Sequence, residues 1–146
     1  MRILVSACLL GVCCRYDGNS KPCQAVMDLG NENELVPVCP EQLGGLPTPR
    51  VPAEIQGERV VSREGRDVTK EYRKGAEEAA RLCRLLRCDC AILKARSPSC
   101  GCGQVYDGSF SGALVPGDGV TARKLKALGV PVATEETLID QGIPYQ

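Results

Sequence analysis

Residues 1–11 have the sequence MRILVSACLLG, and this stretch decides the fold. Residues 3–7 form a short apolar run, which is typical of a strand buried in a parallel sheet. A secretory signal peptide is the alternative interpretation, but the run is brief, has no cleavage region after it, and ends at Gly11 with further cysteines beyond. We therefore interpret this stretch as a buried strand with Cys8 directly after its end.

Strand and helix patterns alternate along the rest of the chain. Short apolar runs predict three further strands, at residues 34–38, 90–95 and 131–134. Helix patterns occupy residues 69–87, 121–128 and 135–140. Strands separated by helices favour a parallel sheet. We expect residues 1–146 to form one small α/β domain, Rossmann-like, with a mostly parallel sheet flanked by helices.

Three local features refine this expectation. Pro37 lies inside the second run and predicts an edge strand. Residues 53–61 predict a small hairpin excursion around Gly57, as a flap over the sheet. Residues 96–107 are rich in Ser, Gly, Pro and Cys and predict a loop. Ligands of parallel sheets bind beyond the carboxyl ends of the strands, so a site is expected there.

The composition excludes several classes of function. Lys plus Arg and Asp plus Glu both number 18, so the formal net charge is zero, which argues against a dedicated nucleic-acid-binding surface. The chain has no histidine, which excludes Ser-His-Asp and Cys-His catalytic units and His-ligated zinc. Aromatic residues are scarce, so base-stacking platforms are not expected. With no segment long enough for a membrane span, we expect a soluble, cytoplasmic protein.

Ten cysteines in a reducing compartment indicate metal or redox chemistry sooner than disulfides. Cys8 and Cys39 directly follow the first two predicted strands, and Cys100 lies five residues after Ala95. If these strands are near neighbours, three thiolates meet at one sheet edge and can hold a soft metal or an iron–sulfur cluster. Three ligands leave one metal position open for substrate, as in catalytic metal sites. The alternative role, small buried hydrophobe, is weakened for Cys100 by its Gly-rich loop.

The other cysteines leave alternatives open. Two Cys-x-Cys pairs indicate a structural zinc or metal-storage protein, with ligands Cys88, Cys90, Cys100 and Cys102. A thiol redox or sulfur-carrier enzyme without metal is a third hypothesis. No role follows for Cys13, Cys14 and Cys23, which lie in or beside predicted loops.

Glu41 and Ser97 are candidates for chemistry near the predicted thiol site. Glu41 lies two residues past Cys39 and can act as general acid or base, although a solvated loop charge has the same signature. Ser97 can hydrogen-bond a substrate or be an ordinary turn residue. Residues 117–119, Gly-Asp-Gly, resemble an anion-binding helix start, but no nucleotide-binding motif is present.

Several motifs in order resemble a bacterial family long labelled as a domain of unknown function, the thiouracil desulfidases. These motifs are SACLLG at 6–11, CRYDG at 14–18, VCPE at 38–41, GGLPTPR at 44–50, DVT at 67–69, GAE at 75–77, Lys94 with SPSCG at 97–101, and GDGVTA at 117–122. The resemblance spans nearly the whole chain. No one motif is specific, but their ordered combination is.

The resemblance implies a [4Fe-4S] cluster held by Cys8, Cys39 and Cys100, with the fourth iron free to bind the sulfur of a thiocarbonyl. The implied reaction converts a thiouracil, or a related small thionucleobase or thioamide, to its oxo product and releases sulfide. Glu41 and Ser97 match positions associated with substrate activation. An open iron is a Lewis acid with high affinity for sulfur, so it would polarise the C–S bond. Further cysteines near the motifs could compete for metal: Cys13, Cys14 and Cys102.

Overall fold

A four-stranded parallel sheet forms the centre of the computed structural model, which describes residues 1–144. Its strands are β1 (Arg2–Ser6), β2 (Glu34–Val38), β5 (Cys90–Leu93) and β8 (Val132–Thr134). Their order in the sheet is β2-β1-β5-β8, and each neighbouring pair is parallel. The four predicted strands are therefore confirmed, and the strand that contains Pro37 lies at an edge.

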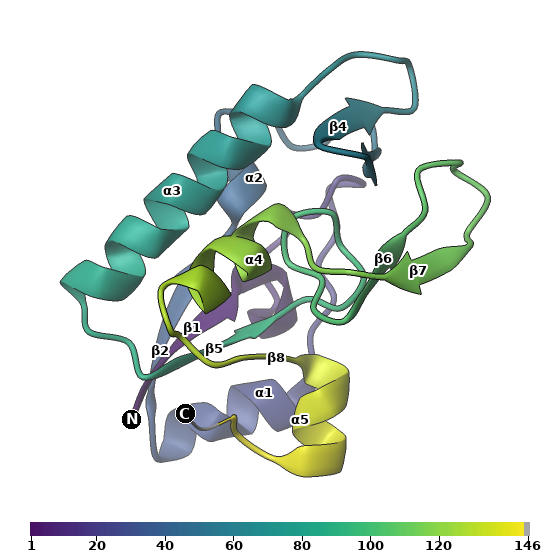
Figure 1. Ribbon diagram of the computed structural model, residues 1–146. Helices are drawn as coiled ribbons and strands as arrows, with labels where there is room; N and C mark the ends of the chain where they lie inside the picture. The colour runs from purple at the N-terminus through teal and green to yellow at the C-terminus, as the bar shows by residue number, and fades with distance from the viewer. Residues whose placement is uncertain (145–146) are drawn as a thin grey trace.

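Helices cover both faces of this sheet (Figure 1). They are α1 (Gln24–Asp28), α2 (Pro40–Leu43), α3 (Thr69–Leu85), α4 (Val120–Ala127) and α5 (Glu135–Gln141), with short 3₁₀ helices at Ala7–Leu10 and Leu29–Asn31. Alternate residues of β1 point to opposite faces: Ile3 and Val5 pack toward α1 and α5, and Leu4 packs toward α3 and α4. None of the helices within residues 1–144 has the length and apolar character needed to cross a membrane.

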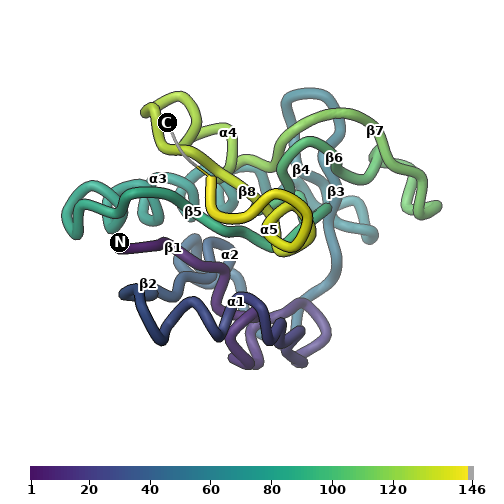
Figure 2. The backbone as a smooth tube through the Cα atoms, turned by 90° about the horizontal axis from the view of Figure 1, so that it is seen from below, coloured from purple at the N-terminus to yellow at the C-terminus, as the bar shows by residue number. Residues whose placement is uncertain are grey.

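The hairpin of β3 (Ala53–Gln56) and β4 (Arg59–Ser62) is confirmed, but its expected place over the sheet is wrong. It lies beyond the carboxyl ends of the parallel strands (Figure 2). The physical reason is a small apolar core of its own, in which Val60 packs with Val68 and Tyr72 at the start of α3. The hairpin therefore forms a wall at the sheet edge where a ligand is expected.

A second hairpin at the same end was not predicted. Its strands are β6 (Gln104–Tyr106) and β7 (Leu114–Pro116), which pair antiparallel. β6 occupies part of the segment that we expected to be loop throughout. Both strands have only three residues, too few for an alternating pattern to stand out among Gly and Ser.

Candidate functional site

A cavity of about 460 Å³ lies at the carboxyl edge of the parallel sheet. Its wall includes residues just past β1, β2 and β5 and residues of both hairpins. All five predicted site residues line it: Cys8, Cys39, Glu41, Ser97 and Cys100. Side chains that are up to 92 positions apart in the sequence (100 − 8) therefore meet in one place.

Cys8 lies on the 3₁₀ helix that directly follows β1. Gly11 ends this helix with a φ of 95°, a left-handed conformation that suits glycine. The carbonyl of Cys8 accepts a hydrogen bond from the backbone N–H of Lys21 at 3.0 Å. The residue is 7% exposed, so the tight turn holds a nearly buried thiol at the cavity.

Cys39 and Glu41 are placed by α2, the short helix after β2. Cys39 is the residue before the helix, Pro40 is its first residue, and Glu41 lies in its first turn. The helix lies directly against α3, because a Cβ atom at Gly75 would collide with the backbone of Pro40, and one at Gly44 would collide with the backbone of Glu71. Only glycine at these two points allows the approach that sets the position of Cys39 and Glu41.

Cys100 lies in a loop tied down by its own hydroxyl groups. The Ser97 hydroxyl accepts hydrogen bonds from the backbone N–H of Ser99 at 3.1 Å and of Cys100 at 3.0 Å. The Ser99 hydroxyl lies 2.8 Å from that of Thr121 on α4, and both residues are fully buried. Ser97 is thus both a turn residue and a cavity residue.

The Gly-Asp-Gly segment before α4 supports this loop and does not form the anion site that its sequence suggested. The first N–H groups of α4 are already occupied: Val120 donates to the carbonyl of Pro98 at 2.9 Å, and Thr121 to that of Ser99 at 2.8 Å. A Cβ atom at Gly119 would collide with the Ser99 carbonyl. The segment therefore packs against the Cys100 loop.

Burial keeps the cavity thiols protonated in the metal-free chain. It raises the pKa of Cys8 and of Cys39 to about 12, and raises that of Cys100 well above its usual value. The neighbouring Glu41 carboxylate raises all three further. A bound metal reverses this, because a coordinating thiol is deprotonated outright. Metal binding here must therefore release protons.

Sequence reasoning left one cavity thiol unassigned and missed two ion pairs. Cys14 is buried and lines the cavity, and its carbonyl accepts a hydrogen bond from the Cys39 thiol at 3.6 Å. Arg50 binds Glu41 at 3.0 Å, and Lys94 binds Glu135 at 2.9 Å. Arg50 and Lys94 lie in quoted motifs, but no spacing rule connects either to its partner.

The scarce aromatic residues gather at the same cavity. Tyr16, Tyr72, Tyr106 and Phe110 are the aromatic residues within 1–144, and all four line it. Their small number argued against a stacking platform, but their placement brings aromatic rings to the wall of one cavity. Aromatic side chains are common in the walls of small-molecule sites.

The structure does not group the four cysteines of the structural zinc alternative. Cys90 begins β5 and Cys88 precedes it, whereas Cys100 follows its carboxyl end. In the described part of the chain, no three Cys, Asp or Glu side chains are grouped to bind a single metal ion.

Known proteins match this chain in sequence and in structure over nearly its whole length. The family model described as 2-thiouracil desulfurase matches residues 3–137. The uncharacterized protein YbbK of Bacillus subtilis (strain 168) is 42% identical over 148 residues, which cover 94% of this chain and 98% of YbbK. A solved structure named [4Fe-4S]-dependent thiouracil desulfidase TudS superposes with a TM-score of 0.89 at 48% identity, over 95% of this chain and 93% of that one.

Proposed function

Since the chain belongs to the 2-thiouracil desulfurase family, we propose that it is a [4Fe-4S]-dependent desulfidase that replaces the sulfur of a thiouracil with oxygen and releases sulfide. The observation that carries this proposal is the shared cavity of Cys8, Cys39, Cys100, Glu41 and Ser97. A small thionucleobase or related thioamide is the substrate, and neither a nucleic acid nor a membrane is required. All ten cysteines are free, which supports action in a reducing compartment such as the cytoplasm.

The residues present fit an iron–sulfur cluster. Cys8, Cys39 and Cys100 would hold it, because thiolates are the usual ligands of such clusters. The three thiols line one cavity and follow three strands that are neighbours in the sheet, so all three could reach the same cluster. When bound, the cluster supplies an open iron as a Lewis acid toward the substrate sulfur.

Glu41 and Ser97 would handle the protons and orient the substrate. Arg50 holds one oxygen of Glu41, which keeps the carboxylate fixed beside the cavity as a base for the attacking water. The Ser97 hydroxyl oxygen already accepts two backbone N–H groups. Its own hydrogen is left to donate to a ring oxygen or nitrogen of the substrate.

The experiment is anaerobic reconstitution with iron and sulfide, followed by metal analysis and an assay of sulfide and uracil released from 2-thiouracil and 4-thiouracil. We expect the wild-type chain to bind four irons and to turn over at least one of these thiouracils. Alanine at Cys8, Cys39 or Cys100 should each lower the iron content, whereas Glu41→Ala and Ser97→Ala should keep the iron and lose turnover.

Two further cysteines serve as controls for the ligand set. Cys14→Ala removes the other thiol that lines the cavity, and Cys13→Ala removes its exposed neighbour. Both should keep the iron. The assigned ligand set would be disproved if Cys14→Ala lost its iron while one of the three proposed ligand variants retained it.

The proposed function has its own contradicting outcomes. A wild-type chain that carries its cluster but releases no sulfide from any thiouracil or thioamide would disprove the function. Turnover without metal would favour the thiol redox alternative.

A further inference from the structure

Lys94 places a half-buried positive charge at the wall of the cavity. Its side chain is 16% exposed and lines the same space as Cys8 and Cys100. The proposed mechanism gives this cation no role.

Glu135, the first residue of α5, holds this lysine from outside the cavity. One of its carboxylate oxygens lies 2.9 Å from the Lys94 ammonium, and the other accepts a hydrogen bond from the backbone N–H of Ala95 at 2.7 Å. The backbone N–H of Lys94 donates to the Ser6 hydroxyl at 2.9 Å. Both ends of the lysine are thus anchored between the segment that leads to Cys8 and the start of α5.

The ammonium has a donor left for a ligand. A lysine carries three N–H donors, and the contacts of Lys94 within residues 1–144 account for two, one to Glu135 and one to the Ala95 carbonyl at 3.3 Å. Stability does not explain such a pair well, because an ion pair that is largely removed from water is often no more stabilising than apolar residues of similar size. A charge kept at the wall of a reaction cavity is better explained by chemistry.

We propose that Lys94 is a further catalytic residue, which stabilises negative charge on the substrate sulfur as it leaves, and that Glu135 is the residue that positions it. This inference rests on the proposed function. In the reaction both bonds of the C=S group break, with their electron pairs on sulfur, and both bonds of the new C=O group form to the oxygen of water. The two water protons end on the departing sulfide, as H₂S or as HS⁻ plus a proton in solvent. No atom is oxidised or reduced, and the charge on sulfur grows as these bonds break.

The test compares Lys94→Met, Lys94→Arg and Glu135→Gln in the reconstituted protein. We expect Lys94→Met to keep its iron and to lose kcat by on the order of 10²-fold, with a smaller change in KM. The midpoint potential of its cluster should become more negative, because cluster potentials follow local charge. Lys94→Arg should recover most of the loss. Glu135→Gln keeps an acceptor for Ala95 but releases the ammonium, and kcat should fall roughly 10-fold.

Lys124→Met is the matched control. Lys124 pairs with Glu77 at 3.1 Å between α4 and α3, and neither residue lines the cavity. This variant should keep the wild-type kcat and potential. The proposal would be overturned if Lys94→Met kept the wild-type kcat and midpoint potential, and the ion pair would then have only a structural role. If Lys94→Met does not fold, the same result in Glu135→Gln would overturn it. Failure of the proposed function would be distinguishable from failure of this inference, because the wild-type chain itself would then bind no cluster or release no sulfide.

Discussion

Glu41 reaches the cavity as one half of an enclosed ion pair with Arg50. The Arg50 side chain is 6% exposed and that of Glu41 is 14% exposed. Arg50 also donates to the Thr48 hydroxyl at 3.2 Å, and its backbone N–H donates to the Tyr16 carbonyl at 2.8 Å. The guanidinium is therefore fixed by its own loop, and the carboxylate takes its position from the guanidinium.

Removing Arg50 should leave an uncompensated carboxylate in a nearly buried place. We expect Arg50→Leu to lower the free energy of unfolding of the metal-free chain by about 2–4 kcal/mol, because breaking a buried pair costs more than the pair contributes. Urea unfolding measures this loss. The double variant Arg50→Leu with Glu41→Leu should recover part of it. Additive losses in the double variant would show that the two side chains do not depend on each other.

At this scale, residues that directly follow strands were predictable and their partners were not. Cys8, Cys39 and Glu41 could be placed because parallel strands end at a common edge. Cys100 followed from its loop after the third strand. The pairing of Lys94 with Glu135 spans 41 positions and depends on how α5 packs, which no local pattern encodes.

The element that matters most for the site is α2, because it carries Glu41 and begins at Cys39. With four residues it is too short to be stable alone, so its position comes from its contact with α3. That contact depends on Gly44 and Gly75, whose missing side chains let the two backbones meet.

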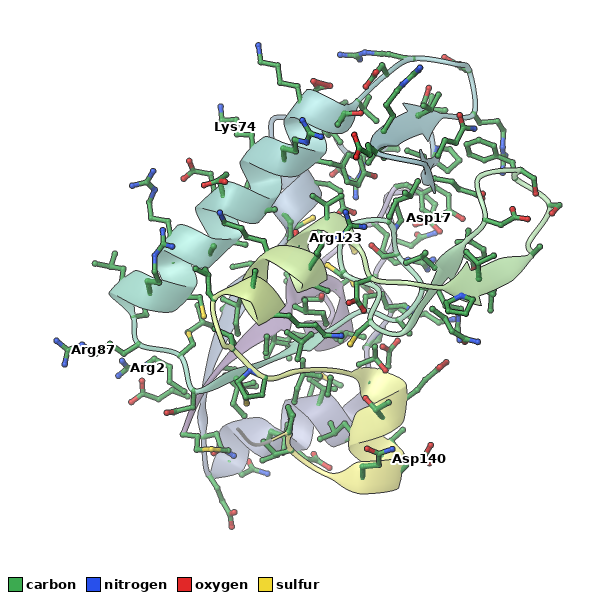
Figure 3. The ribbon with its side chains drawn as sticks, viewed as in Figure 1. Arg2, Asp17, Lys74, Arg87, Arg123 and Asp140 are labelled. Atoms are coloured by element: carbon green, nitrogen blue, oxygen red, sulfur yellow. The ribbon has the colours of Figure 1, made fainter. Side chains whose placement is uncertain are left out.

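Gly75→Ala should push α2 away from α3. Alanine normally stabilises a helix interior relative to glycine, but here its Cβ would collide with the Pro40 backbone, which has no rotamer to yield. We expect a loss of about 1–3 kcal/mol in the free energy of unfolding and less iron bound after reconstitution. Urea unfolding and iron analysis measure both. Lys74→Ala, an exposed neighbour on α3 that points outward in Figure 3, should match the wild type. A Gly75→Ala chain as stable as the wild type would contradict the close approach.

The elements themselves were predictable where they are long or strongly patterned. The stripe of α3, with Ala76, Ala79 and Cys83 buried, and the apolar run of β5 could be read directly. The β6–β7 hairpin could not, because its strands are short and β7 is exposed along its length. An exposed strand has no apolar alternation to reveal it.

At the scale of the whole molecule, helices cover both faces of the sheet, and the cavity lies at its carboxyl edge. The alternation of strands and helices predicted this architecture, because a parallel sheet needs a crossover between strands and buries both faces. It did not predict that both hairpins wall the carboxyl edge, because their docking depends on contacts such as that of Val60 with Tyr72. That residues 1–146 act as a single domain stays a prediction.

The buried thiols at the carboxyl edge make the free energy of unfolding depend on pH. Burial raises the pKa of Cys8 and of Cys39 from about 9 to about 12, so the folded metal-free chain keeps protons that the unfolded chain loses. Stability is then full below about pH 9 and falls as the pH rises toward 12. Each thiol should contribute a loss of roughly 1–2 kcal/mol between about pH 9 and 10.5.

Cys8→Ala should therefore flatten the alkaline loss of stability. The measurement is the free energy of urea unfolding of the metal-free chain, under reductant, at a series of pH values from neutral to about 10.5. The variant should lose roughly 1–2 kcal/mol less than the wild type over the alkaline part of that range. Cys13→Ala removes an exposed thiol and should follow the wild-type curve. If the Cys8→Ala curve instead runs parallel to the wild type, the Cys8 thiol is not desolvated in the folded chain, and the cavity is open to water where the cluster would bind.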